Sequence, residues 1–468
     1  MKKQLKNLSI FIFLSLVLIS CTEDDSVSRE DFIVAFENPS ENFSAEVNEI
    51  NITIVFASAA PENGKITVTY NLNNVEENQF STNPTITEGT IVVPFSANSE
   101  QTSFSITKEN ANISAEDPFI EFSISEVSLE NSFPQGNIST KVNFAEAASL
   151  GGSISPEIGG PNEGNQVYVD LSGKTTTEVF REKWDLGFFS GEEFRVKLNA
   201  SLFMMAASLG NVEFDEVNET NVESLQGQMA FLVPGSDEYV DAPSGNINET
   251  AIDEISITED ENNVYLLKLG NKVGTETPEI GSIAVAGEAR GWKKIQILRD
   301  NNEYVLRYAD LNSNSYQEIT IPKTPSHNFT FFSFNTENIV TVEPQKQNWD
   351  LNFTVFTEVL DLPEGGFGAY GFSDYVSTNT LANVEAYQVN TSEISYQDFS
   401  TSTILEEKFE LDQRVIGANW RDVFSGMYTD RFYIIKDTEG NFYKLRFTAF
   451  LNENGVRGYP SFEYELLN

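Results

Sequence analysis

The sequence is poor in the residues on which most catalytic and metal sites depend. It contains one cysteine, Cys21, and one histidine, His327, in 468 residues. A single cysteine excludes a disulfide within the chain and a zinc–thiolate site. His327 would have to serve any Ser-His-Asp triad, yet the Gly-x-Ser-x-Gly motif that presents such a serine is absent. We therefore predict that the chain is not an enzyme.

Basic residues are scarce as well. The chain has 29 Lys and Arg against 71 Asp and Glu, which gives a formal net charge of −42. Nucleic acids and anionic lipid surfaces are bound through basic patches, so we expect neither as a partner. A dispersed acidic surface mainly keeps a protein in solution. The chain is not disordered, because 40% hydrophobic residues, with 36 Phe and 16 Tyr, suffice for apolar cores.

A long apolar run occurs only at the start of the chain. A basic start precedes the run from Leu8 to Ile19, which is typical of a signal peptide and short for a membrane span. We predict a signal peptide over residues 1–20, acylation of Cys21, and an acidic tether over residues 21–29. Ordinary cleavage that leaves a free thiol is the alternative. The acidic tether resembles the surface-export signal of some Gram-negative lipoproteins, so we expect an outer-membrane, cell-surface location with lipid as the only anchor.

Residues 30–147 are predicted to form a run of short strands. Ile50, Ile52 and Ile54, for example, alternate with polar residues. About seven strands at this spacing predict an Ig-like β-sandwich. The stretch GTIVVPFSANSEQTSFSI resembles Calx-β domains, which often bind calcium, but the acidic residues here are scattered and we assign no calcium site. We expect a spacer that holds the following domain away from the membrane.

A duplicated motif marks the C-terminal region. A Gly- and Pro-rich flexible linker is predicted over residues 148–163, and the β pattern then resumes over residues 164–468. The motif Trp184-Asp185-Leu186-Gly187-Phe188 recurs as Trp349-Asp350-Leu351-Asn352-Phe353, 165 residues later (349 minus 184). Apolar and polar residues alternate in both copies, which predicts half-buried strands.

A second pair of segments supports the duplication. Residues 297–308 and 434–447 each predict a β-hairpin with a polar turn between apolar alternations. We interpret the region as two related β-rich halves, with short helices near residues 200–209 and 381–387. An apolar loop over the sheet is the alternative for residues 200–209. The predicted fold class is therefore all-β, with an N-terminal sandwich and a larger β-rich domain.

Four stretches of this region carry a family resemblance: YVDLSGKTTTEVFREKWDLGFFSGEEFRVKLNASLFMMAASLG, RGWKKIQIL, KQNWDLNFTVF and DRFYIIKDTEGNFYKLRF. They resemble the HmuY-like haem-binding lipoproteins over residues 164–468. The resemblance implies a surface-anchored protein that captures haem and passes it to an outer-membrane receptor, expected to be TonB-dependent. Because a family does not guarantee its ligand, a surface interaction or glycan-binding lipoprotein without haem stays open as the alternative.

The resemblance also implies that two axial side chains hold the haem iron, histidine in some members and methionine in others. A single histidine excludes a bis-histidine pair. Met204, Met205 and Met229 lie in the part of the domain from which methionine-ligated members take their ligands. We therefore expect Met229 and Met204, or its neighbour Met205, to bind the iron. The ordinary role of a methionine is packing in a core.

Three other motifs are interpreted as structural. We expect the Trp of each Trp-Asp copy in the core and the Asp bonded to a neighbouring turn. Gly366–Gly371 matches Gly-x-Gly-x-x-Gly but lacks the flanking strand and helix of a dinucleotide site, which predicts a flexible loop. Asp310, Asn312 and Asn314 are followed by neither the Gly nor the Glu of a calcium loop, which predicts a polar turn.

Overall fold

The computed structural model describes residues 32–43, 49–109, 118–144 and 149–467. This part of the chain is mostly β-strand, with one α-helix, α1 (Glu219–Gln226), and several short 3-10 helices. None of its helices has the length and apolar character needed to cross a membrane. The predicted signal peptide, Cys21 and the acidic tether lie outside the described residues.

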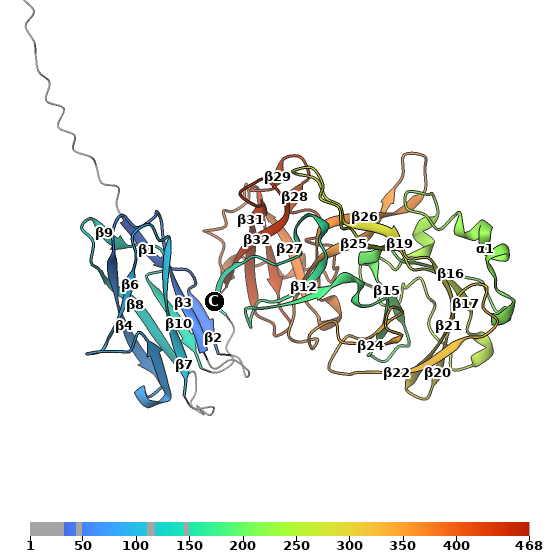
Figure 1. Ribbon diagram of the computed structural model, residues 1–468, viewed down its shortest axis with the longest axis horizontal. Coiled ribbons are helices and arrows are strands. Elements are labelled where there is room, and N and C mark those ends of the chain that lie inside the picture. The colour runs from blue at the N-terminus through green and yellow to red at the C-terminus, as the bar shows by residue number, and fades with distance from the viewer. Residues whose placement is uncertain (1–31, 44–48, 110–117, 145–148, 468) are drawn as a thin grey trace, which may run out of the picture.

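The N-terminal domain is a sandwich of two five-stranded sheets (Figure 1). Its strands are β1 (Phe32–Phe36), β2 (Ser40–Asn42), β3 (Glu49–Phe56), β4 (Gly64–Asn73), β5 (Phe80–Asn83), β6 (Thr90–Phe95), β7 (Gln101–Lys108), β8 (Phe119–Val127), β9 (Ser132–Pro134) and β10 (Ser139–Asn143). The sheet orders are β5-β7-β3-β1-β9 and β2-β10-β8-β4-β6. Alternate side chains of both sheets, such as Val34, Ile54 and Phe122, share one core. The predicted sandwich is confirmed.

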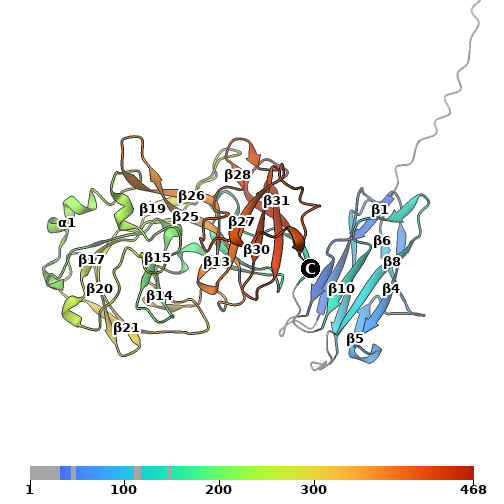
Figure 2. The same cartoon turned by 180° about the vertical axis from the view of Figure 1, so that it is seen from behind.

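The C-terminal region is built on two five-stranded outer sheets. The proximal sheet, order β11-β32-β31-β30-β27, lies beside the N-terminal domain, and the distal sheet, order β16-β17-β20-β21-β22, lies at the far end (Figures 1 and 2). The proximal strands are β11 (Gly151–Ile154), β27 (Glu385–Asn390), β30 (Arg431–Lys436), β31 (Phe442–Leu451) and β32 (Arg457–Leu466). The distal strands are β16 (Met205–Ser208), β17 (Val264–Lys268), β20 (Trp292–Asp300), β21 (Glu303–Ala309) and β22 (Gln317–Pro322).

Two four-stranded inner sheets lie between the outer ones, with the orders β13-β12-β25-β26 and β15-β14-β23-β24. Their strands are β12 (Asn165–Asp170), β13 (Thr175–Phe180), β14 (Leu186–Phe189), β15 (Val196–Leu198), β23 (Phe329–Ser333), β24 (Asn338–Val340), β25 (Leu351–Asp361) and β26 (Phe367–Thr378). The ribbons β18 (Asn271–Val273) with β19 (Ala286–Ala289), and β28 (Arg421–Asp422) with β29 (Gly426–Met427), complete the region.

The two halves exchange strands in the inner sheets. Strand β12 of the first half pairs with β25 of the second, and β23 of the second half pairs with β14 of the first. The two inner sheets have equivalent orders. If β13, β12, β25 and β26 are replaced in turn by β24, β23, β14 and β15, the first order becomes the second order in reverse. The prediction of two related halves is therefore confirmed, and each half needs a strand of the other to complete its inner sheet.

The strands that pair with the two motif copies are offset differently from the copies themselves. Val169 and Phe332 each lie opposite the Leu of one Trp-Asp copy, so these strands are offset by 163 residues (332 minus 169) rather than 165. The hairpins predicted over residues 297–308 and 434–447 exist as β20–β21 and β30–β31. In sheet order, however, β20–β21 corresponds to β31–β32, so the two similar hairpins occupy different positions.

The Trp-Asp strands are buried on both faces. The Leu and Phe of each copy pack in the core of their own half. The intervening aspartates, Asp185 and Asp350, are only 0% and 1% exposed. The prediction of half-buried strands is therefore wrong, because the exchange of strands places the other half over the second face.

The glycine-rich segment predicted as a flexible linker contributes a strand. β11 pairs antiparallel with β32 of the proximal sheet. Gly151 has a φ of +123°, and a Cβ at this residue would lie 2.2 Å from the carbonyl oxygen of Tyr464. The fold therefore requires a glycine here because two strands approach closely, and not because the chain must be flexible.

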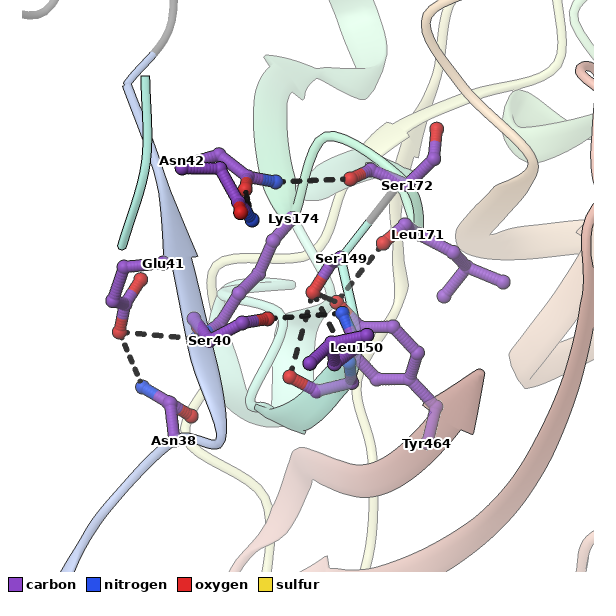
Figure 3. A network of polar contacts seen from close by, with 12 residues as sticks. Asn38, Ser40, Glu41, Asn42, Ser149, Leu150, Leu171, Ser172, Lys174 and Tyr464 are labelled. Atoms are coloured by element: carbon purple, nitrogen blue, oxygen red, sulfur yellow. Dashed lines mark hydrogen bonds and ion pairs between the residues drawn. The ribbon is translucent and has the colours of Figure 1, made fainter. Parts of the chain in front are cut away.

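A polar network joins the N-terminal domain to the C-terminal region (Figure 3). The N–H of Leu150 donates to Ser40 Oγ at 2.9 Å, and the ammonium of Lys174 pairs with Glu41 Oε1 at 3.1 Å. The Lys174 and Glu41 side chains are only 11% and 21% exposed, so solvent screens this pair less than an exposed one. The two parts are thus held together by direct contacts as well as by the chain connection.

Candidate functional site

The two motif tryptophans lie in a central cluster between the halves. Trp184 packs edge-on against Phe331 with ring centroids 4.8 Å apart, and Trp349 packs in the same way against Tyr168 at 5.0 Å. Their exposed fractions are 3% and 8%. The expectation that these tryptophans are core residues is confirmed. The central cluster consists of Tyr168, Val179, Trp184, Phe329, Phe331, Val342 and Trp349.

The motif aspartates bind the backbone just beyond the exchanged strands. Asp185 Oδ2 accepts the N–H of Phe334 at 2.6 Å, and Asp350 Oδ2 accepts the N–H of Leu171 at 2.8 Å. Burial raises the pKa of both carboxyls, although Arg290 pairs with Asp185 at 2.6 Å. The predicted bonds to neighbouring turns are confirmed, and they tie each Trp-Asp copy to the other half.

The three candidate methionines fall into two different cores. Met205 and Met229 are each 0% exposed and belong to one apolar cluster against the distal sheet. Met204 points the other way, because successive residues of an extended chain alternate in direction, and it packs in the core of the first half. The structure therefore brings Met205 and Met229 together and leaves Met204 apart. Their ligation of iron stays a prediction.

A long connection between β16 and β17, here named the covering segment (residues 209–263), closes the methionine cluster. It carries η5 (Phe214–Glu216) and α1, whose Phe214 and Val222 pack in the cluster. Lys268 of β17 donates to the carbonyl oxygen of Met229 at 2.8 Å. Met229 itself lies in the covering segment, so this segment carries one of the two thioethers.

The donors of this cluster fit haem chemistry, but their packing leaves no room for a porphyrin. Two thioethers are competent axial ligands. Neither Met205 nor Met229, however, lines the central cavity or the surface groove described below. A large planar ligand needs a pocket of roughly several hundred Å³. It therefore reaches these sulfur atoms only if the covering segment separates from the distal sheet.

Two concave sites lie elsewhere in the C-terminal region. The central cavity, of about 130 Å³, lies between the halves and is lined by Trp184, Trp349 and Met204 among others. The surface groove, of about 620 Å³, is lined in part by Tyr375 and Arg414. Among the described residues, no methionine or histidine lines this groove. It is large enough for a porphyrin but lacks the donors expected for the iron.

The remaining sequence motifs are structural. Asp310 begins a turn and pairs with Lys293 at 2.7 Å, as predicted for a polar turn. The flexible loop predicted at Gly366–Gly371 is wrong for residues 367–371, which belong to β26 and pair with residues 357–361 of β25. In the described part of the chain, no three His, Cys, Asp or Glu side chains are grouped to hold a metal.

Three charged residues of the central cavity were not predicted from the sequence, namely Lys197, Asp241 and Glu343. Lys197 stands between the apolar residues of β15, where an alternating pattern predicts a solvent-facing side chain. The sequence carried no signal for these residues: with the motif offset of 165 residues Gln166 aligns with Phe331, and only the strand pairing aligns it with Phe329.

A family model described as "HmuY protein" matches residues 162–321 and 326–464, one segment in each half. No curated protein sequence matches the chain. The N-terminal domain is similar to Calx-β domains at low identity. The Calx CBD1 domain in its apo form is 13% identical, with a TM-score of 0.21, over 25% of this chain and 96% of that chain. A two-domain protein of unknown function from Bacteroides fragilis is 11% identical, with a TM-score of 0.20, over 75% of this chain and 84% of that chain.

Proposed function

Because this chain belongs to the HmuY family, we propose that it is a non-catalytic haem-binding lipoprotein of the cell surface. In this proposal the protein captures haem at the outer membrane and passes it to a TonB-dependent receptor. The signal peptide and the acylated Cys21 expected from the sequence support this location. The family match to both halves supports haem as the ligand.

Met205 and Met229 are the proposed axial pair, and their shared apolar cluster is the observation that carries this assignment. Met204 is the alternative partner of Met229. Methionine ligation raises the reduction potential of haem iron, so the ferrous form is expected to bind more tightly. Access requires the covering segment to separate from the distal sheet, since both thioethers are 0% exposed.

A visible-absorption titration of the purified mature chain with haem tests the proposal. We expect a shifted Soret band that is stronger under reducing than under oxidising conditions. Met205→Ala and Met229→Ala should each weaken the reduced complex. Met204→Ala distinguishes the alternative: if Met205 is the ligand it should leave the reduced complex unchanged, because this adjacent, equally buried methionine packs in a different core.

Opening of the covering segment is tested by hydrogen exchange of the amides of α1 with and without haem. Haem should increase exchange in α1. A wild-type chain without a Soret shift in either redox state would overturn the haem proposal and favour the surface-interaction or glycan-binding alternative. Loss of binding in His327→Ala, with binding intact in the methionine variants, would overturn the assigned ligands.

A further inference from the structure

The central cavity is lined by a row of polar side chains from one inner sheet. Tyr168 lies directly opposite Asn352, and Asn352 lies directly opposite Ser377. Directly opposed residues of antiparallel strands project from the same face of a sheet. All three residues line the cavity. A polar row is therefore buried at the contact between the two halves, where an apolar row would serve packing better.

The internal symmetry shows that one polar atom in this cavity lacks its expected partner. The indole N–H of Trp184 donates to Gln166 Oε1 at 2.7 Å. In the second half Phe329 replaces this glutamine (329 minus 166 is 163), and Trp349 Nε1 has no hydrogen-bond partner among the described residues. Asn352 Oδ1 has none either, and both residues are only 8% exposed. A buried polar atom without a partner destabilises a fold. Because the fold provides an acceptor for the N–H of Trp184, the unpaired N–H of Trp349 points to a bound molecule.

Lys197 presents a cation to the same cavity. Its Nζ lies 3.9 Å from the ring centroid of Phe329 and 5.3 Å from that of Trp184, and its stem lies against Gly187. Within the described residues its ammonium makes contacts to aromatic rings but no hydrogen bond or ion pair. Three N–H donors of the cation are therefore unused.

Two carboxyls near the cavity are already bonded to the backbone. Asp241 accepts the N–H groups of Leu198 at 2.7 Å and Ala251 at 3.0 Å, and Glu343 accepts that of Phe329 at 2.8 Å. Burial raises the pKa of Asp241 to about 6 and that of Glu343 to about 7. The other titratable groups that face Glu343 are the Lys197 ammonium and the Tyr168 hydroxyl. The negative charge around the cavity therefore falls as the pH falls through this range.

We propose that the central cavity binds a small monocarboxylate. The unused groups are mainly donors, namely the Lys197 ammonium, the Trp349 N–H and the Tyr168 hydroxyl, and a carboxylate supplies both acceptors and the opposite charge. The aromatic rings offer apolar surface to a short carbon chain. A cavity of about 150 Å³ holds benzene, so one of about 130 Å³ takes a ligand of about six non-hydrogen atoms. This site is separate from the Met205–Met229 cluster and does not depend on it, although Met204 lines the cavity.

Isothermal titration calorimetry of the purified chain with sodium propionate tests this proposal. Sodium chloride at the same concentration controls for salt, and propionamide controls for shape without charge. We expect propionate to bind, chloride and propionamide not to bind, and propionate binding to weaken from pH 6 to pH 8.5 as Glu343 loses its proton. Two of the four tryptophans line the cavity, so intrinsic fluorescence should change with propionate.

Lys197→Met should weaken propionate binding about tenfold or more, because a hydrogen bond to a charged group is lost. Lys272→Met is the matched control: this lysine forms an exposed pair with Glu288 outside the cavity, and its substitution should leave binding unchanged. Trp349→Phe keeps an aromatic ring and removes the unpaired N–H, so it should also weaken propionate binding. This variant tests the site independently if the Lys197→Met protein does not fold.

Three results would each overturn the proposal. Wild-type protein that does not bind propionate would show that the cavity does not select a small monocarboxylate. Equal binding of propionamide would exclude recognition of charge. Unchanged propionate affinity in both Lys197→Met and Trp349→Phe would place the ligand elsewhere. A haem titration of the same samples keeps the two proposals distinguishable, since neither variant changes the methionine cluster.

Discussion

At the scale of single residues, buried carboxyls determine how the stability of this protein depends on pH. Glu343, Asp241, Asp185 and Asp350 all have raised pKa values because burial disfavours their charged forms. A carboxyl with a raised pKa binds its proton more tightly in the folded chain than in the unfolded chain. Its contribution to stability is therefore present at low pH and is lost as the pH rises through the folded pKa.

Glu343→Gln tests this at one position. The ordinary pKa of 4.5 rises to about 7, which corresponds to a free energy on the order of 3 kcal/mol between pH 4.5 and pH 8. We expect the wild-type melting temperature to fall from pH 5.5 to pH 8.5, and the Gln variant to show a smaller fall, measured by thermal unfolding at both pH values. The exposed Glu276→Gln is the control and should keep the wild-type fall. An unchanged pH dependence in Glu343→Gln would contradict the assignment.

At the scale of elements, strand exchange explains why the Trp-Asp motif occurs twice. Each motif strand pairs with a strand of the other half, and each motif Asp bonds the backbone just beyond that strand. The Trp of each copy packs in the shared central cluster. The motif therefore serves the contact between the halves.

The pairing of β11 with β32 gives a prediction about glycine. Gly151→Ala should destabilise the C-terminal region by about 1–3 kcal/mol, because the new Cβ meets the carbonyl oxygen of Tyr464 at 2.2 Å. Gly365→Ala is the matched control: it also has a positive φ, +91°, but nothing lies within 4 Å of its Cβ. Denaturant unfolding of the two variants separates the cost of φ from the cost of the contact. Equal losses would show that β11 does not need the close approach.

At the scale of the whole molecule, the N-terminal domain and the methionine cluster lie at opposite ends. The chain enters the described structure at β1, whereas α1 and the distal sheet lie farthest from this domain in both views (Figures 1 and 2). The polar network at the junction restrains the two parts relative to each other. In the proposed lipoprotein this arrangement holds the candidate haem site away from the anchored end.

The lipid anchor is tested by Cys21→Ala in cells. Because lipid is the only proposed membrane anchor, the variant should leave the membrane fraction and appear in the soluble fraction, followed by immunoblotting. Ser26→Ala, a substitution in the same tether, should keep the protein with the membrane. Retention of the Cys21→Ala protein after a high-salt wash would contradict the proposal.

Local patterns were sufficient to predict much of this fold from the sequence. Period-two alternation at positions such as Ile50, Ile52 and Ile54 predicted the strands of the sandwich, because a strand with one covered face requires it. The repeated Trp-Asp motif predicted two related halves, and its residues predicted a buried Trp and a bonded Asp. These features depend on interactions close in sequence or on residue type alone.

Tertiary structure alone decided the rest. The alternation could not show that β14 and β25 are covered on both faces, because the second cover comes from the other half. The local pattern could not distinguish a flexible Gly151 from one in close contact with β32. It also could not show that Met205 shares a cluster with Met229 whereas Met204 does not. Lys197 and Trp349 are brought to one cavity by strands far apart in the chain. The burial of a residue and the partner of a polar atom depend on such distant segments, which a local pattern does not contain.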